Sequence, residues 1–185
     1  MLRIKILLLF FMPLAACNPT INVGYKYDRL RPKILKSEYP FQTISENLYS
    51  LEYNGGFFGE DEKIAYDYLL YASAKLALDN NNNKFELYPS SIKGINVSQD
   101  FKNPVYAIKK AKAVVDLNPK KLSSITFDAS SVCAILQYEY YEGKIPADAY
   151  NCSFEDNASV RELTESKIKS YYNNFIDIVR GNKLP

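Results

Sequence analysis

Residues 48–88 constrain the fold more than any other part of the chain, because they read as strand, turn, helix and strand in direct succession. Residues 48–53 alternate with a period of two, which predicts a strand with Tyr49, Leu51 and Tyr53 on one face. The adjacent glycines at 55–56 supply the positive φ that a sharp turn needs. The period then changes from that of a strand to that of a helix.

The predicted helix covers about residues 61–79, and residues 80–83 are expected to end it before a strand at 85–88. Its apolar positions recur at helical spacing and form one stripe: Ala65, Tyr68, Leu69, Ala72 and Leu76. A strand and a helix joined by a short turn bury their apolar faces against each other, so we predict that this unit forms the core. It contains no catalytic motif.

The same stretch resembles an uncharacterised family of small alphaproteobacterial envelope lipoproteins. The resemblance covers about residues 41–87 and, more weakly, 125–149, and it is carried by Tyr49, Leu51, Tyr53, Gly55, Asp67-Tyr68-Leu69-Leu70, Ala74, Leu76, Leu78 and Phe85. Ala72 and Lys75 depart from it, since the family has an Arg and a Glu there. The resemblance implies a lipid-anchored α+β domain and supplies no known activity.

The first 17 residues have the pattern of a lipoprotein signal peptide, residues 1–16, followed by the cysteine at which it is removed from the mature protein. Arg3 and Lys5 make a basic start, and the apolar run at 6–12 is too short to span a bilayer. Leu14-Ala15-Ala16-Cys17 then places small residues directly before a cysteine. We therefore predict cleavage after residue 16 and acylation of Cys17, with palmitate among the chains; the alternatives are an ordinary secretory signal or an uncleaved anchor.

Residues 17–38 are predicted to be a lipidated tether, and residues 39–185 the folded domain. Asn18 follows the cysteine, where Asp would resemble a signal for inner-membrane retention, so the outer membrane is the expected destination. The basic residues of the tether could favour anionic lipid headgroups, although a solvated linker is the favoured interpretation. Residues 39–46 are expected to approach the first strand and to pair briefly at a sheet edge.

Composition excludes several classes of function. The chain has 23 basic and 21 acidic residues, and removal of Arg3 and Lys5 brings the net charge near zero, which argues against a nucleic-acid partner. The absence of histidine removes the usual catalytic triads and most zinc sites. No Gly-rich phosphate loop is present. We expect no cofactor and no metal.

Acidic residues at 60–62 open the predicted helix. Paired carboxylates could act as general acid and base or bind a hard cation. Acidic residues in a first turn also cap the backbone amides and meet the positive end of the helix dipole, and this structural interpretation is favoured.

Residues 89–99 are rich in turn formers, with one short strand expected near 92–97. Asn103-Pro104 predicts the start of a second helix that ends near Asn118 and looks like an insertion relative to the resemblance. Its predicted stripe is Ala107, Ile108, Ala111, Val114 and Val115, with Lys109, Lys110 and Lys112 off the stripe. These lysines could contact phosphate or peptidoglycan acids, but a solvated face is favoured.

Residues 124–143 have the strongest strand pattern, typical of a central strand that divides in two or bulges near 128–131. The cluster Tyr138, Tyr140 and Tyr141 could present an aromatic binding surface, although packing within the sheet is favoured.

Cys133 and Cys152 remain after lipidation, and an even number of cysteines in an oxidising compartment predicts a disulfide between this strand and the following loop. It would stabilise the fold by about 3 kcal/mol. A catalytic thiol would need a base, and the chain has no histidine.

Ser159 and Glu162 have the spacing of a capping box, which predicts a last helix up to about Arg180. Its broad apolar side is expected to pack on the sheet or, less favoured, to serve a partner; it comprises Val160, Leu163, Ile168, Tyr171, Phe175 and Val179, widened by Tyr172, Ile176 and Ile178.

Together these patterns predict an α+β fold: a single domain with an antiparallel sheet and helices packed on one face, behind a lipoprotein signal and tether. The expected function is that of a lipid-anchored envelope protein, periplasmic or surface-exposed, with a non-catalytic structural, assembly or interaction role and an envelope protein as partner. The alternative is a small-molecule or glycan-binding lipoprotein that uses the tyrosine-rich surface. An enzyme based on carboxylates and tyrosines is the third reading. A concave pocket lined by a carboxylate and several of Tyr138, Tyr140 and Tyr141 would favour binding or catalysis, whereas a flat apolar patch at the last helix would favour a partner protein.

Overall fold

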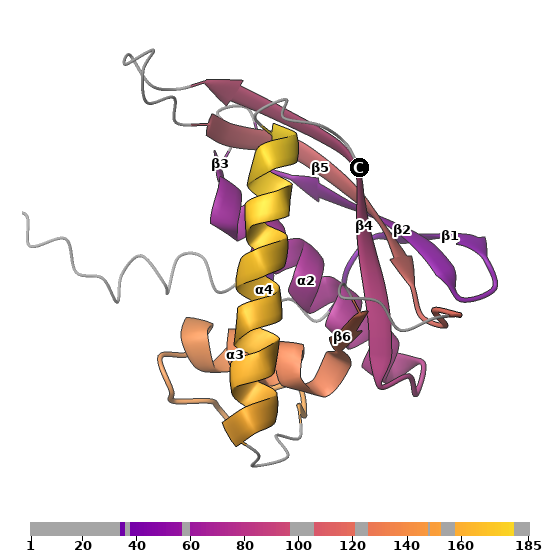
Figure 1. The fold of residues 1–185 in the computed structure, drawn as a ribbon, viewed down its shortest axis with the longest axis vertical. Helices are drawn as coiled ribbons and strands as arrows, with labels where there is room; N and C mark the ends of the chain where they lie inside the picture. Colours follow the sequence, from indigo (N-terminus) through magenta and orange to yellow (C-terminus); the bar gives the residue numbers. More distant parts are fainter. Residues whose placement is uncertain are drawn as a thin grey trace, which may run out of the picture.

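An antiparallel sheet forms one side of the domain, and three helices pack on it (Figure 1). The computed structural model describes residues 34–35, 38–56, 60–96, 106–120, 126–147, 149–152 and 158–179. In chain order the elements are β1 (Phe41–Ser45), β2 (Leu48–Asn54), β3 (Glu60–Asp61), α2 (Glu62–Asp79), β4 (Lys84–Asn96), β5 (Tyr106–Asp116), β6 (Thr126–Asp128), α3 (Ala129–Tyr140) and α4 (Ala158–Val179). The α+β class is confirmed.

The strand order is β1-β2-β5-β4-β6, and β3 pairs with β5 beyond the end of β2. The predicted strand at 48–53 is β2, and the pairing expected upstream of it is the edge strand β1. Gly56 has φ +78°, which confirms the predicted turn, and the amide of Gly55 donates to the carbonyl of Lys109 at 2.8 Å. The turn therefore stays beside β5 before α2 begins.

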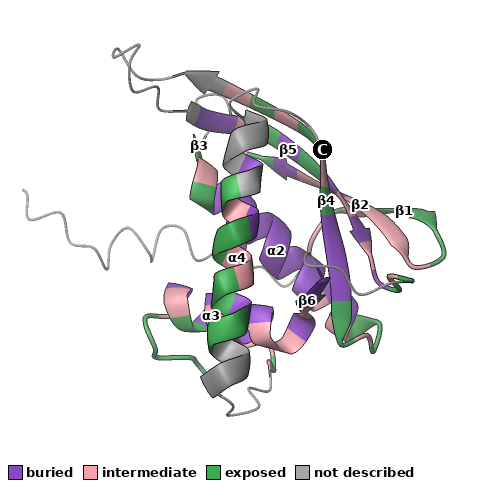
Figure 2. Ribbon diagram, viewed as in Figure 1, coloured by how far each residue is buried: buried purple, intermediate pink, exposed green. Residues whose placement is uncertain are grey.

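The predicted core helix is α2, and its stripe is buried as expected. Burial extends much further round the helix than that stripe, as Figure 2 shows. α2 lies against β2, β4 and β5, while α3 and α4 pack on it from other directions. Because neighbours surround it, polar residues such as Asp67 and Ser73 are buried as well.

The second predicted helix is wrong: residues 106–116 form β5, which lies in the centre of the sheet. Ala111, Ala113 and Val115 are fully buried while Lys110 and Lys112 are exposed, which is a period of two. An alanine-rich segment fits both periods, and pairing with β2 on one side and β4 on the other decides between them. The segment is therefore part of the core sheet.

The predicted central strand at 124–143 is also wrong. Of its described residues, 126–143, only β6 is a strand, and it leads directly into the helix α3. The bulge expected near 128–131 is a helix cap, because Asp128 Oδ1 accepts a hydrogen bond from the Ser131 amide at 2.8 Å. Gly143, with φ +74° and its amide donating to the Tyr138 carbonyl at 2.8 Å, ends the helix.

β4 is longer than predicted, since it continues through the segment expected to be rich in turns. Its register against β5 shifts between Pro89 and Ser91 and again between Lys93 and Gly94. These irregularities accommodate a proline and a glycine that would weaken a regular strand.

The last helix is confirmed as α4, but its buried side differs from the predicted one. Leu163 is 59% exposed, whereas Thr164, Tyr171 and Phe175 are buried. The two buried aromatic residues set the rotation of the helix. At about 100° per residue, Leu163 lies about 80° round the helix from Tyr171 and about 120° from Phe175, so it falls outside the buried side. The side chains at 158–161, 174 and 176–179, including Ser159 of the capping box, lie outside the described residues.

Packing begins upstream of Tyr39, the expected start of the domain. Ile34 is fully buried in the core, and the Tyr39 hydroxyl donates to its carbonyl. The predicted signal peptide, Cys17 and most of the predicted tether lie outside the described residues. Among the helices of the described part, none has the length and apolar character needed to cross a membrane.

Candidate functional site

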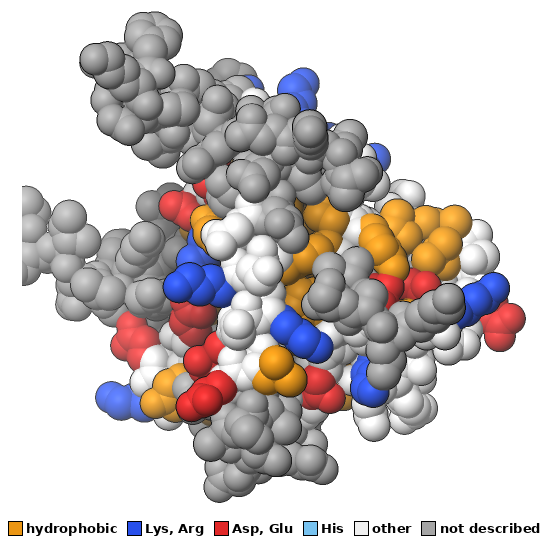
Figure 3. Space-filling view, viewed as in Figure 1, with side chains coloured by type: hydrophobic (Ala, Val, Ile, Leu, Met, Phe, Trp, Pro, Cys, Tyr) orange, Lys and Arg blue, Asp and Glu red, His pale blue; other side chains and the backbone are white. Residues whose placement is uncertain are grey.

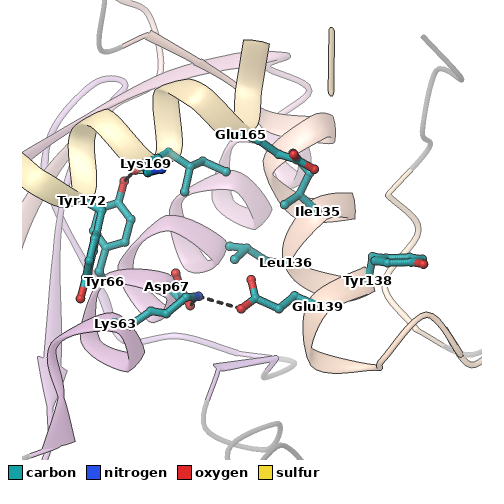
Figure 4. Close-up of a pocket in the computed structure, with 11 residues that line it drawn as sticks. Lys63, Tyr66, Asp67, Ile135, Leu136, Tyr138, Glu139, Glu165, Lys169 and Tyr172 are labelled. Atoms are coloured by element: carbon teal, nitrogen blue, oxygen red, sulfur yellow. Dashed lines mark hydrogen bonds and ion pairs between the residues drawn. The ribbon is translucent and has the colours of Figure 1, made fainter. Parts of the chain in front are cut away.

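A pocket of about 310 Å³ lies between α2, α3 and α4 (Figure 4). Its lining combines apolar and aromatic side chains with both signs of charge: Lys63, Tyr66, Asp67, Ile135, Leu136, Tyr138, Glu139, Glu165, Ile168, Lys169 and Tyr172. Acidic and basic side chains gather on the surface over α3 and the adjoining part of α4 (Figure 3). We call this site the three-helix pocket.

Aromatic and aliphatic side chains make its apolar part. The rings of Tyr66 on α2 and Tyr172 on α4 lie 5.3 Å apart. The Tyr66 hydroxyl donates to the Ile168 carbonyl at 2.9 Å, so α2 and α4 are tied together at the pocket. Leu136 is buried, and Ile168 is partly buried against the core. These contacts keep the apolar part preformed.

The polar part is a network centred on Asp67, a residue only 1% exposed. Its Oδ2 accepts hydrogen bonds from Lys63 Nζ at 2.5 Å and from the Tyr140 hydroxyl at 2.6 Å. Lys63 Nζ also donates to Glu139 Oε1 at 2.8 Å and lies 5.7 Å from the centre of the Tyr140 ring. One ammonium group thus joins two carboxylates, one on α2 and one on α3.

Burial dominates the electrostatics of Asp67. It raises the pKa of this carboxyl to about 6, against the opposing effects of Lys63 and of the Tyr140 hydrogen bond. For Lys63, burial lowers the pKa, but the carboxylates of Asp67 and Glu139 outweigh it and the pKa is raised overall. At neutral pH the network therefore holds one ammonium between two carboxylates, an arrangement that can recognise a cation or exchange a proton.

The predicted tyrosine surface is not a single surface, because its residues lie on a helix and not on a strand. Tyr138 is 52% exposed at the pocket, Tyr140 is buried beneath Lys63, and Tyr141 lies just past the end of α3. Successive helical positions point about 100° apart, so these three side chains diverge. Tyr138 instead lines the three-helix pocket with Tyr66 and Tyr172, a combination that the sequence did not predict.

Cys133 and Cys152 are paired at disulfide-bonding distance, with their Cα atoms 5.8 Å apart. The pair joins the helix α3, not a strand, to the following loop. The same loop is held by Gln137 Nε2, which donates to the Tyr150 carbonyl at 2.8 Å, and by the Tyr150 hydroxyl, which donates to Asp79 Oδ1 at 2.5 Å. The pairing thus fixes the α3 side of the three-helix pocket.

Of the acidic residues at the start of α2, Asp61 has the structural role that was favoured above. Asp61 Oδ1 accepts a hydrogen bond from the Lys63 amide at 2.8 Å and caps the helix. Within the described ranges, no cluster of three or more acidic, cysteine or histidine side chains is placed to hold a metal ion.

The lysines predicted to be solvated lie on β5, and two of them form ion pairs on the outer face of the sheet. Glu52 Oε1 lies 3.2 Å from Lys110 Nζ, and Glu52 Oε2 lies 2.9 Å from Lys112 Nζ. Gln42, Ser50 and other polar residues border a shallow hollow there of about 360 Å³. We call this surface the outer sheet face.

Sequence reasoning missed Lys63, Asp67 and Glu139 as members of one site. A signal was present, because Lys63 and Asp67 have the i,i+4 spacing of a helical ion pair, and Asp67 interrupts an apolar run. Glu139 comes from an element that was predicted to be a strand. Comparison with known proteins found no matching family model, no matching curated protein and no matching solved structure. The resemblance to envelope lipoproteins therefore stays a prediction.

Proposed function

We propose that this protein is a lipid-anchored component of a bacterial cell envelope with a non-catalytic structural, assembly or interaction role. The support for the anchor is the basic start, short apolar run and small residues before Cys17. Acylation at Cys17 would tether the domain to a membrane, with the outer membrane as the proposed destination.

The interaction role rests chiefly on the outer sheet face and the edge strand beside it. β1 ends the strand order of the described sheet, and an edge strand offers backbone groups that a partner segment can pair with. Ile44 on this strand is 52% exposed. Glu52, Lys110 and Lys112 give the adjoining face a polar character that suits a hydrated, reversible contact.

The test combines labelling with crosslinking in intact envelopes. Wild type should incorporate labelled palmitate and capture one envelope protein, whereas a Cys17→Ala variant should do neither. An Ile44→Asp variant should keep the label and lose the captured protein, while Glu162→Ala, an exposed change on α4, should keep both. Palmitate incorporation that survives Cys17→Ala would disprove the anchor, and capture that survives Ile44→Asp would disprove the role of the β1 edge.

A second candidate function is small-molecule binding, and the three-helix pocket favours it. Its volume of about 310 Å³ lies at the lower end of the range for ligand sites. Three tyrosines and three carboxylates line it, although Tyr138 is the one member of the predicted cluster Tyr138, Tyr140 and Tyr141 among them. Lys63, Asp67 and Glu139 in its lining are already ion-paired with one another, and this arrangement suits ligand binding better than catalysis.

A further inference from the structure

We propose that the three-helix pocket binds a small amphipathic amine, with the ammonium group on Asp67 and Glu139 and the apolar body against the walls made by α3 and α4. This inference rests on the second candidate function, since it names the chemical class that such a pocket would take. No other part of the molecule is required for it.

The head-group site is identified by the ammonium that already occupies it. Lys63 Nζ is bound by the carboxylates of Asp67 and Glu139 and lies 5.7 Å from the centre of the Tyr140 ring. Two carboxylates and an aromatic face are the groups that recognise a primary ammonium. An external amine would meet the same groups in the same places.

Exposure explains how an external amine could replace the internal one. The side chain of Lys63 is 47% exposed, whereas that of Asp67 is 1% exposed. The Lys63 stem lies at the surface and can extend so that its ammonium enters water, while the ammonium of the incoming amine takes over the ion pair with Asp67. Asp67 cannot turn away, because the Tyr140 hydroxyl holds it at 2.6 Å. The carboxylate therefore stays in place while its cation is exchanged.

The apolar body would lie beside this head-group site. Leu136 and Ile168 come from α3 and α4, and the paired rings of Tyr66 and Tyr172 complete the wall. Figure 4 shows Leu136, Tyr66 and Tyr172 around the same space as the Lys63–Glu139 ion pair. A volume of about 310 Å³ accommodates a short alkyl or aryl group better than a long acyl chain.

The balance of charge favours a cation over an anion. Three carboxylates and two ammonium groups line the pocket, and one of the ammonium groups, Lys63, is the proposed competitor. A ligand carboxylate would face Asp67 and Glu139 at close range, and like charges repel strongly where water is limited. An amine is therefore the ligand class that this pocket accommodates.

Binding should weaken in acid. The carboxyl of Asp67 has a pKa of about 6, so below that pH it becomes neutral and attracts an ammonium group less. The other titratable or charged groups that line the pocket or face Asp67 are Lys63 and Tyr66 from α2, Tyr138, Glu139 and Tyr140 from α3, and Glu165, Lys169 and Tyr172 from α4.

The experiment compares three probes of equal chain length on the detergent-solubilised mature protein: hexylamine, hexan-1-ol and hexanoate. Calorimetry at pH 8 should show hexylamine binding, with hexan-1-ol weaker by about tenfold or more and hexanoate weaker still. Glu139→Gln should weaken hexylamine by about tenfold, whereas Lys110→Met, which alters an ion pair on the outer sheet face, should leave it unchanged. Lowering the pH to 5 should weaken hexylamine binding to wild type.

Lys63→Met should tighten hexylamine binding at pH 8, because the internal competitor is gone. If that variant does not fold by circular dichroism, Glu139→Gln decides, since the Glu139 side chain is 34% exposed and its change is tolerable. Equal hexylamine binding by wild type and Glu139→Gln would overturn the amine assignment. Binding of hexanoate in place of hexylamine would overturn it too while leaving small-molecule binding intact, and binding of no probe would overturn both. Palmitate incorporation at Cys17 reports on the envelope role separately.

Discussion

In the three-helix pocket Asp67 lies beside one lysine, and on the outer sheet face Glu52 lies between two lysines. The pKa values of these two carboxyl groups nevertheless shift in opposite directions. Burial raises the pKa of Asp67 to about 6 despite Lys63. Hydrogen bonds from Lys112 and then Lys110 lower the pKa of Glu52 below its usual value, because its side chain is 34% exposed and loses little hydration. The ionised carboxylate is thus costly to the folded state in the pocket and mildly favourable on the sheet, although each is paired with lysine. The difference comes from desolvation of the buried carboxylate.

Removal of the buried carboxylate should have the largest effect. Asp67→Ala removes the carboxylate that accepts from the buried Tyr140 hydroxyl and leaves a cavity in its place, and it should lower the free energy of unfolding by about 3 kcal/mol. Urea denaturation at pH 7 measures this change. Glu52→Ala is the matched control on the sheet, and an equal loss in both variants would contradict the contrast.

The pH dependence of stability should differ in sign at the two sites. The folded pKa of Asp67, about 6, lies above its ordinary value of 3.8, so this group disfavours folding at pH 7 and the penalty disappears as the pH falls through 6 toward 4. Its contribution to the free energy of unfolding should rise by about 2 kcal/mol over that interval. Glu52, with a lowered pKa, contributes stability at neutral pH that is lost as the pH falls below its unfolded value of 4.5.

Urea titrations at several pH values can isolate the Asp67 contribution, with Asp67→Asn as the reference because the amide cannot ionise. The difference between wild type and this variant should grow in favour of wild type as the pH falls from 7 to 4. A constant difference would show that Asp67 titrates as it does in the unfolded chain.

Loss of the Tyr140 hydroxyl should have a smaller effect. Tyr140→Phe removes a hydrogen bond to a buried charged group and should cost about 2 kcal/mol at pH 7. It should also raise the pKa of Asp67 further, since the donor stabilises the charged form. Tyr138→Phe, a change in a 52% exposed residue of the same helix, should cost much less. NMR titration of the Asp67 carboxyl measures its pKa. An unchanged pKa in Tyr140→Phe would show that the Tyr140 hydroxyl does not stabilise the Asp67 carboxylate.

The smallest effect is expected on the sheet. Glu52→Gln should change the free energy of unfolding by about 0.5 kcal/mol, because exposed ion pairs contribute little and salt screens them. Denaturation of wild type and variant in low and high salt checks this, with the difference disappearing in high salt. A difference that persists in high salt would place Glu52 in a less hydrated environment than its exposure indicates.

The sequence by itself determined the elements whose signals are local. The β2 strand, the glycine turn and the helix α2 follow one another within a short stretch, and the cap at Asp61 lies at its start. Each depends on alternation, on positive φ or on a capping side chain, and none depends on distant contacts. The last helix was predictable for the same reason.

Only the tertiary structure decided the character of the two segments that were predicted the wrong way round. Residues 106–116 satisfy both a helical and a strand period, and pairing with β2 and β4, which precede them in the chain, selects the strand. Residues 129–140 carry β-favouring residues, but the Asp128 cap and packing on α2 select the helix α3. Short apolar runs are ambiguous in period, so non-local contacts decide them.

The candidate site follows the same division. The i,i+4 pair of Lys63 and Asp67 is written in the sequence, as are the cysteines that pair at disulfide-bonding distance. Burial of Asp67 and the arrival of Glu139 and Tyr140 depend on how α3 and α4 pack over α2. Sequence specifies which groups can ionise, whereas the pKa of a carboxylate depends on the water that distant segments remove from it, and only the folded chain sets that quantity.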